Sequence, residues 1–446
     1  MELAIINGTV VSHLGRYKAD IAVADGVITA LVKPGGLRTG EARTVIDAGG
    51  LFVLPGCIEA HSHFREPGHE YKEDFYTGSM AAAAGGITTV FEMANTKPLA
   101  DGPKEILDKI ALISGRSFVD YCLHGLVTKR NIGRLTEMLA VGVRGFKAMM
   151  SLSAMGTPTV DDGELLCALR ELQKTDTVLT VHAENTSIVN VEKQRLQDAG
   201  RTDWKAHMES RPVISEIEAI TRAILLCEET GCRLHIAHIA AGRSVDIIRR
   251  AKHHGIRVTC ETGPHNLTLT DADYERLGPS MFMNPPVRPI EDQNALWQGI
   301  RDGTVDMIST DHSPHSEEEK FAANSVWKTK SGLAGVETSV PVMLTTVNAG
   351  KLTLEQYVKV SSFNQAHHFR IYPRKGAIQV GSDADFTIVD MGKTGIIRKE
   401  DLKSKTKVMP YDGFHYTGAP VYTIIRGNIA MKDGVVDLSK RVGQLI

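Results

Sequence analysis

The apolar run Leu51-Phe52-Val53-Leu54-Pro55-Gly56, with His61-Ser62-His63-Phe64-Arg65-Glu66-Pro67-Gly68 shortly after it, is the most informative part of this chain. The run predicts a buried strand over Phe52–His61. Alternate residues of a strand point to the same face, so His61 and His63 project together at its end. Two imidazoles placed in this way can hold one metal ion at about 2.0–2.1 Å. A chance His-x-His pair on a loop is the alternative, and only further residues of the same kind can exclude it.

Strands and helices alternate through the middle of the sequence, where apolar runs are bounded by turn residues. The expected strands are Phe52–His61, Thr88–Met93, Val119–His124, Val143–Met149, Val178–His182, Arg233–His238, Arg257–Glu261 and Val305–Thr310. The expected helices include Lys104–Ser114, Gly163–Gln173, Ser215–Thr230 and Ser244–His253. Eight strands with intervening helices predict an α/β fold, a closed (β/α)8 barrel of the TIM type. An open doubly wound sheet is the rival, but no Gly-x-Gly-x-x-Gly sequence follows the first strand.

The two ends of the chain differ from its middle. Residues 1–50 and the C-terminal segment both contain short strands separated by turn sequences such as Asn7-Gly8 and Asp433-Gly434. We therefore expect both termini to combine into one small β-sandwich beside a metal-dependent barrel. The expected divisions are residues 1–54 and 373–446 for the sandwich and residues 55–372 for the barrel. The long irregular segment Ser313–Gly335, after the last barrel strand, is typical of a functional loop or lid.

The composition excludes several classes of protein. The 446 residues are 42% hydrophobic and 23% charged, with a formal net charge of −2. These values fit a globular protein and give no electrostatic footprint for nucleic acid or an anionic membrane. We recognise no secretion signal at Met1-Glu2-Leu3-Ala4, and no uninterrupted apolar stretch reaches about 18 residues. The six cysteines include no Cys-x-x-Cys pair, which favours reduced thiols in a cytoplasmic protein.

Polar residues recur where the expected barrel strands end, on the face where barrel enzymes carry their chemistry. They are His61, His63, Lys147, His182, Glu184, His235, His238, Asp311, His312 and His315. Buried imidazoles beside a carboxylate are costly unless a cation neutralises the site. Lys147 is unusual here, because its ammonium would repel a metal ion. Carbamylation by CO₂ would turn it into a carboxylate long enough to bridge two ions; the alternative is that Lys147 pairs with an acid such as Asp161 or Asp162.

Over essentially its full length the chain resembles the cyclic amidohydrolases of the dihydroorotase, hydantoinase and allantoinase group. The matching motifs are His61-Ser62-His63, Gly145-Phe146-Lys147, Val181-His182-Ala183-Glu184-Asn185, Leu234-His235-Ile236-Ala237-His238 and Asp311-His312-Ser313-Pro314-His315. The resemblance implies two divalent metal ions, usually zinc. The implied ligands are His61, His63 and Asp311 for one ion and His182 and His238 for the other, with carbamylated Lys147 bridging the two. Asp311 would also be catalytic, carrying a proton from the attacking water to the departing ring nitrogen, and His235 would pack in the core.

Residues outside the implied ligand set bear on the substrate. In dihydroorotases the positions matching Arg65, Asn95 and His315 bind a carboxylate, and Asn284 matches a ring contact. A guanidinium suits a carboxylate because it offers paired hydrogen bonds. We therefore expect dihydroorotase activity, which interconverts dihydroorotate and N-carbamoyl-aspartate. A hydantoinase or allantoinase that hydrolyses a five-membered cyclic ureide is the alternative, and Ala94, where dihydroorotases usually have proline, keeps it open.

Three hypotheses from other classes can be weighed against this one. A non-catalytic homologue that acts in assembly would have lost ligands, whereas all six implied positions are filled. A barrel deaminase generally uses one metal ion and has no bridging lysine, so Lys147 argues against it. An isoaspartyl-type amidohydrolase acting on linear dipeptides should lack the segment Asn284-Pro285-Pro286. The expected partner is a small cyclic amide, without nucleic acid or membrane, and the expected assembly is a homo-oligomer, either a dimer or a tetramer.

Overall fold

A computed structural model describes residues 1–152, 155–322 and 325–446 of the chain. Its centre is an eight-stranded sheet in which all neighbouring strands are parallel and follow the order of the sequence. The strands are β8 (Cys57–Ser62), β9 (Ile87–Glu92), β10 (Asp120–Leu126), β11 (Val143–Met149), β12 (Val178–His182), β13 (Arg233–Ile236), β14 (Val258–Thr262) and β15 (Met307–Ile308). A parallel bridge between Ser62 and His312 joins the first strand to the segment after the last. The predicted barrel is therefore confirmed.

Helices follow the barrel strands in alternation, as the hydrophobic periodicity predicts. They are α1 (Phe75–Ala84), α2 (Pro103–Ile113), α3 (Leu135–Leu139), α4 (Asp162–Gln173), α5 (Thr186–Asp198), α6 (Lys205–Glu209), α7 (Val213–Thr230), α8 (Gly242–His253), α9 (Pro264–Thr268), α10 (Tyr274–Leu277), α11 (Ile290–Asp302), α12 (Ser339–Asn348), α13 (Leu354–Val358) and α14 (Asn364–His368). Local chemistry sets their ends. A capping box of Asp161 and Glu164 starts α4, and Gly231, with φ of 67°, ends α7 in the left-handed conformation that glycine adopts easily.

Strands from both termini form two further sheets. The smaller sheet has the order β5-β4-β1-β6, and the larger has the order β19-β18-β17-β16-β7-β2-β3. Their strands are β1 (Leu3–Ile6), β2 (Thr9–Ser12), β3 (Gly15–Lys18), β4 (Asp20–Ala24), β5 (Val27–Val32), β6 (Thr44–Asp47), β7 (Phe52–Pro55), β16 (Phe386–Ile396), β17 (His415–Ile425), β18 (Asn428–Lys432) and β19 (Val435–Val436). N-terminal residues such as Ile5 and Val53 share one buried cluster with Phe386 and Ile424. This confirms the sandwich built from both termini.

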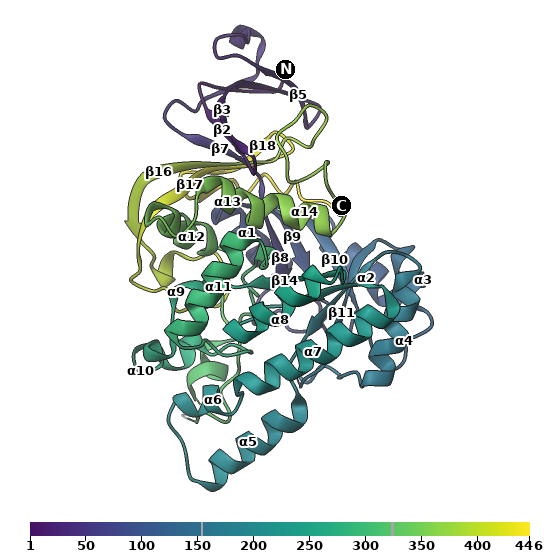
Figure 1. Ribbon diagram of the computed structural model, residues 1–446. Helices are drawn as coiled ribbons and strands as arrows, with labels where there is room; N and C mark the ends of the chain where they lie inside the picture. The colour runs from purple at the N-terminus through teal and green to yellow at the C-terminus, as the bar shows by residue number, and fades with distance from the viewer. Residues whose placement is uncertain (153–154, 323–324) are drawn as a thin grey trace.

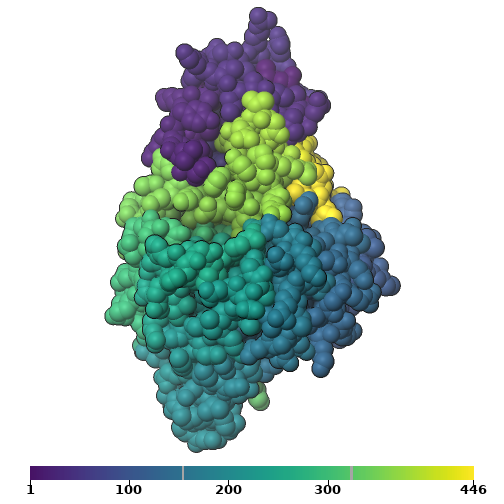
Figure 2. All heavy atoms as spheres, turned by 45° about the vertical axis from the view of Figure 1, so that its right-hand side comes forward, coloured from purple at the N-terminus to yellow at the C-terminus, as the bar shows by residue number. Residues whose placement is uncertain are grey.

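Figure 1 shows the N-terminal strands (purple) and the C-terminal strands (yellow) together at one end of the molecule, with the barrel at the other. Helices α5 and α6, which follow β12, lie farthest from the sandwich. The space-filling view in Figure 2 shows the C-terminal segment between the N-terminal strands and the barrel. Because β8 starts next to the sandwich, the carboxyl ends of the barrel strands face away from it.

One expected strand is in fact two. The run Phe52–His61 was predicted as a single buried strand, but β7 ends at Pro55 and pairs with β2 and β16 in the sandwich, whereas β8 starts at Cys57 in the barrel. Apolar periodicity cannot separate them because both strands are buried. The domain limits at residues 54 and 372 stay predictions. The chain passes from the sandwich to the barrel between Pro55 and Cys57, close to the first limit.

An ion-pair cluster ties the sandwich to the barrel. The Lys375 ammonium lies 2.5 Å from Asp120 of β10, 2.9 Å from Asp383 and 2.5 Å from Asp385. All four side chains are buried. The three carboxylates are close enough to suit a metal ion, but Lys375, Arg426 on Asp120 and Arg374 on Asp383 already supply three positive charges against them.

Candidate metal centre and active site

All ten site residues predicted from the sequence line one cavity at the carboxyl ends of the barrel strands. They are His61, His63, Arg65, Asn95, Lys147, His182, His238, Asn284, Asp311 and His315. Strands β8, β11 and β12 supply His61, Lys147 and His182, and segments that follow strands supply the other seven side chains. The expectation that these side chains converge is met, and their roles stay predictions.

The first group of expected ligands comes together at the junction of β8 with the segment after β15. The Asp311 Oδ1 atom lies 3.4 Å from His61 Nε2 and 3.1 Å from His63 Nε2. One ligand atom from each of His61, His238 and Asp311 lies within 4.8 Å of the others. Asp311 and His238 have φ of 48° and 36°, in the left-handed region that residues other than glycine seldom adopt. Strain of this kind is common at functional sites, where surrounding contacts hold the side chain in place.

The second group consists of His182, at the end of β12, and His238, two residues beyond β13. The Nδ1 atom of His182 lies 3.0 Å from the Nε2 atom of His238. The His238 ring is also 5.3 Å from that of His61, centroid to centroid, so the two groups are neighbours. Two imidazole nitrogens that face each other at this distance can both bind the same small cation.

Lys147 points into the cavity and not into solvent. It is 2% exposed, and its Nζ atom has no hydrogen-bond partner among the described residues. The alternative pairing with Asp161 or Asp162 is wrong, since Asp161 caps α4 and Asp162 pairs with Arg222. Burial lowers the pKa of Lys147 to about 8, against the opposing charges of Asp311 and Glu261. A buried amine with this pKa is partly neutral near pH 8, and the neutral amine is the form that reacts with CO₂.

The electrostatics of these residues fit a site for divalent cations. Burial lowers the pKa of His63 to about 3 and that of His238 well below its usual value, so both rings are neutral and keep a lone pair. Burial alone would raise the pKa of Asp311, but the neighbouring His61 and His63 imidazoles outweigh it and lower that pKa. Neutral imidazoles with an ionised carboxylate form a donor set that zinc and similar metals accept.

Two buried glutamates contact the expected ligands, and the sequence analysis gave neither of them a role. Glu261 Oε1 of β14 lies 2.5 Å from His61 Nδ1, and Glu184 Oε2 lies 2.9 Å from His182 Nε2. His235 is buried as expected, but its Nε2 atom lies 3.4 Å from Glu261 Oε2. The His-x-Glu spacing of His182 and Glu184 could have pointed to one of these contacts, whereas the link of Glu261 to His61 joins strands far apart in sequence.

The expected substrate contacts lie in the same cavity. Arg65 is buried, and its Nη2 atom donates to Ser313 Oγ at 2.6 Å. Asn95 donates to Thr157 Oγ1, and its own Oδ1 atom has no partner among the described residues, nor does His315 Nε2. Buried polar atoms without partners are rare, so these two are free to bind a ligand. The expected ring contact, Asn284, lines the cavity and has its Oδ1 atom 3.1 Å from His207 Nε2.

The loop Ser313–Gly335 contributes Ser313, His315, Ser331 and Gly332 to the cavity. Residues 323 and 324 of this expected lid lie outside the described residues. The loop includes a short helical turn at Glu318–Ala322, where Glu319 pairs with Lys72 and His315.

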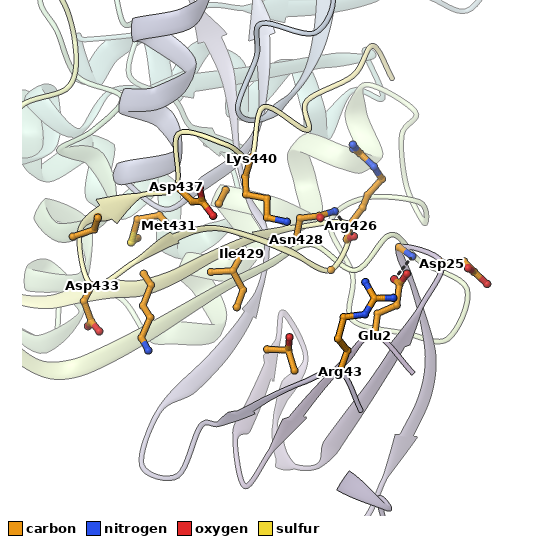
Figure 3. A pocket seen from close by; sticks show the side chains of 16 residues that line it. Glu2, Asp25, Arg43, Arg426, Asn428, Ile429, Met431, Asp433, Asp437 and Lys440 are labelled. Carbon is orange, nitrogen blue, oxygen red and sulfur yellow. Dashed lines mark hydrogen bonds between the residues drawn. The ribbon is translucent and has the colours of Figure 1, made fainter. Parts of the chain in front are cut away.

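A wider hollow lies elsewhere, between the N-terminal strands and the hairpin of β18 and β19. Figure 3 shows its lining, which includes Arg43, Arg426 and Lys440 as well as Glu2 and Asp437. Its charges are of both signs, and Arg426 is committed to Asp120. None of the expected site residues is among those that line it.

A barrel with such a donor set at the carboxyl ends of its strands is typical of metal-dependent hydrolases. The model of the amidohydrolase family matches residues 52–430, and the chain belongs to this family. It is 38% identical to an L-hydantoinase of Paenarthrobacter aurescens over 100% of this chain and 98% of that protein. It is 39% identical to an allantoinase of Rubrobacter xylanophilus, with 98% and 95% of the two chains covered. The solved L-hydantoinase (dihydropyrimidinase) of Arthrobacter aurescens has the same fold, with a TM-score of 0.97, 38% identity and 99% of each chain covered.

A dihydroorotase of Methanothermobacter thermautotrophicus is 37% identical over 94% of this chain and 92% of that protein. The chain is thus an enzyme of the cyclic amidohydrolase group, as expected. The preference for dihydroorotase is not confirmed, because hydantoinase and allantoinase relatives match over more of the chain. Arg65, Asn95 and His315, on which the expectation rests, bear on a carboxylate of the substrate and do not determine the size of its ring. Among the described residues, no helix is both long and apolar enough to cross a lipid bilayer.

Proposed function

We propose that this chain is a binuclear metal-dependent hydrolase that opens the ring amide of a five-membered cyclic ureide, of the hydantoin or allantoin type. The observation that carries the proposal is the convergence of four imidazoles, one carboxylate and the Lys147 amine in a single buried cavity. The hydantoinase and allantoinase relatives support the choice of ring.

The residues present fit two divalent ions, for which we propose zinc. His61, His63 and Asp311 would hold one ion, and His182 and His238 the other. Carbamylation of Lys147 would give a carboxylate between them and remove the cation that now opposes metal binding. When bound, such a pair of ions lowers the pKa of water and polarises the carbonyl group under attack.

Asp311 is the proposed proton carrier. Its carboxylate lies beside His61 and His63 in the cavity and is ionised, so it can accept a proton from the water that attacks the ring carbonyl carbon. The bond from that carbon to the ring nitrogen then breaks, and Asp311 returns the proton to the nitrogen. The product is the open N-carbamoyl compound or a related amide, and ring closure follows the same path in reverse.

The second candidate substrate is a ring that carries a carboxylate group, and dihydroorotate belongs to this class. It is favoured by Arg65, which is buried in the cavity with two hydrogen bonds to the loop and no acidic partner within ion-pair distance among the described residues. The unpartnered atoms of Asn95 and His315 support it. An uncharged ring would leave this cation without compensation.

A hydrolysis panel on zinc-loaded protein tests the proposal. The panel contains hydantoin, 5-methylhydantoin, allantoin, dihydroorotate and 5-carboxymethylhydantoin. We expect a five-membered ureide to be opened with the highest kcat/KM and the carboxylate-bearing member to be preferred over its neutral analogue. Failure to open any ring, with two zinc ions bound per chain, contradicts the proposed activity. Exclusive turnover of dihydroorotate would instead establish the second candidate.

A further inference from the structure

Each of the two expected ion positions has one histidine whose far ring nitrogen meets a buried glutamate. For His61 the glutamate is Glu261 of β14, at 2.5 Å from Nδ1. For His182 it is Glu184, at 2.9 Å from Nε2. Both glutamates are at most 2% exposed. The two contacts use opposite ring nitrogens, which leaves Nε2 of His61 and Nδ1 of His182 turned towards the other ligands.

The choice of ring nitrogen matters because a neutral imidazole has one N–H and one lone pair. A carboxylate that accepts the N–H fixes which nitrogen carries the lone pair and holds the ring plane in place. His61 must present Nε2 to reach Asp311, and His182 must present Nδ1 to reach His238. Each glutamate binds the nitrogen that has to carry the hydrogen in that arrangement.

Each glutamate has a different neighbour besides its histidine. The Arg211 guanidinium donates to the same Glu184 oxygen that faces His182. The second oxygen of Glu261 lies 3.4 Å from His235 Nε2, a contact without hydrogen-bond geometry, and the Nδ1 atom of His235 lies 2.9 Å from Thr259 Oγ1. The two supports share no residue, so they can be disturbed separately.

We infer that Glu184, anchored by Arg211, and Glu261, buried against His61, are positioning residues, each of which sets the affinity of one of the two metal ions. The inference rests on the proposed metal centre but not on the identity of the substrate. Loss of an outer hydrogen bond of this kind typically weakens metal binding 10- to 100-fold.

Zinc content at a fixed free zinc concentration tests this inference. Wild-type protein, Glu184→Gln and Glu261→Gln are equilibrated against a zinc buffer at the lowest concentration that gives wild type two ions per chain. Glutamine keeps the size of the side chain and removes its charge. We expect each variant to retain about one ion and to recover the second when free zinc is raised about 10- to 100-fold. Circular dichroism and urea midpoints show whether the variants stay folded, and Glu229→Gln on the surface end of α7 is the matched control, with two ions expected.

Pairing each variant with His182→Ala separates positioning from general damage. If Glu184 acts through His182, then adding Glu184→Gln to His182→Ala should remove no further zinc, whereas adding Glu261→Gln should remove the remaining ion. Arg211→Lys should behave as a weaker form of Glu184→Gln.

Two outcomes overturn the inference. One is an unchanged zinc content in both single variants; the other is equal further loss from both double variants. Two ions per wild-type chain without hydrolysis of any ring would refute the proposed substrate class and leave the positioning role intact. A wild-type chain that binds no zinc would refute both.

Discussion

Replacing Arg65 by glutamine is the sharpest test of how the substrate is recognised. Arg65 is 2% exposed, and its guanidinium is held by Ser313 Oγ and the Pro314 carbonyl, so its position does not depend on a ligand. A hydrogen bond between charged groups contributes about 1.5–3 kcal/mol, which corresponds to roughly 10- to 150-fold in kcat/KM. Residue 65 has φ of 64° in the folded chain. Glutamine and arginine share this backbone cost, so it cancels in the comparison.

The assay compares 5-carboxymethylhydantoin with its neutral isostere, 5-carbamoylmethylhydantoin, on wild type and on Arg65→Gln, both loaded with zinc. We expect kcat/KM for the anionic substrate to fall about 10- to 150-fold and that for the amide to change less than about threefold. Zinc content measured on both proteins controls for damage to the metal centre. An equal loss on both substrates would refute the reasoning, because Arg65 would then act on the ring or on the fold and not on a carboxylate.

Four other outcomes follow from the structure. Lys147→Met should lower bound zinc and kcat by on the order of 100-fold without unfolding the barrel, as judged by metal analysis and circular dichroism. Prolonged dialysis against a chelator should abolish activity, and added zinc, manganese or cobalt should restore it. Lys375→Met leaves buried carboxylates at Asp120 and Asp385 without their ammonium and should cost about 3–5 kcal/mol in the free energy of unfolding, measured by urea titration; an unchanged midpoint would contradict this. Burial would raise the pKa of Glu184, but the Arg211 guanidinium outweighs burial and holds that pKa at about 2. The ionised Glu184 carboxylate therefore stabilises the fold fully above about pH 4.5, and this stabilisation is lost as pH falls towards 2. In metal-free protein, Glu184→Gln should therefore lose less stability than wild type between pH 5 and 3.

The sequence predicts the barrel well because its strands are buried on both faces and alternate with amphipathic helices. The ends of α4 and α7 follow from Asp161 and Gly231, which act locally. The boundary between β7 and β8 could not be predicted, because both strands are apolar and only tertiary pairing assigns one to the sandwich and one to the barrel. Helix ends set by neighbouring residues can be predicted from the sequence, whereas the assignment of a buried strand to one of two sheets cannot.

The same distinction applies to the site. Ligand candidates such as His61 and Asp311 could be found because they stand at strand ends, and strand ends converge in a parallel barrel. Glu261 and Arg211 could not, because a glutamate becomes an imidazole's partner only through the packing of strands distant in sequence. The expected dihydroorotate ring is not confirmed, for a related reason. Arg65 indicates that the cavity can bind a negatively charged group, and several cyclic amides can carry such a group.

The most direct test of the metal centre is anomalous X-ray diffraction at the zinc edge from crystals of the zinc-loaded protein. We expect two peaks per chain, one among His61, His63 and Asp311 and one between His182 and His238, with extra density on Lys147 Nζ reaching both. A single peak elsewhere, or an unmodified Lys147 turned away from both ions, would contradict this expectation.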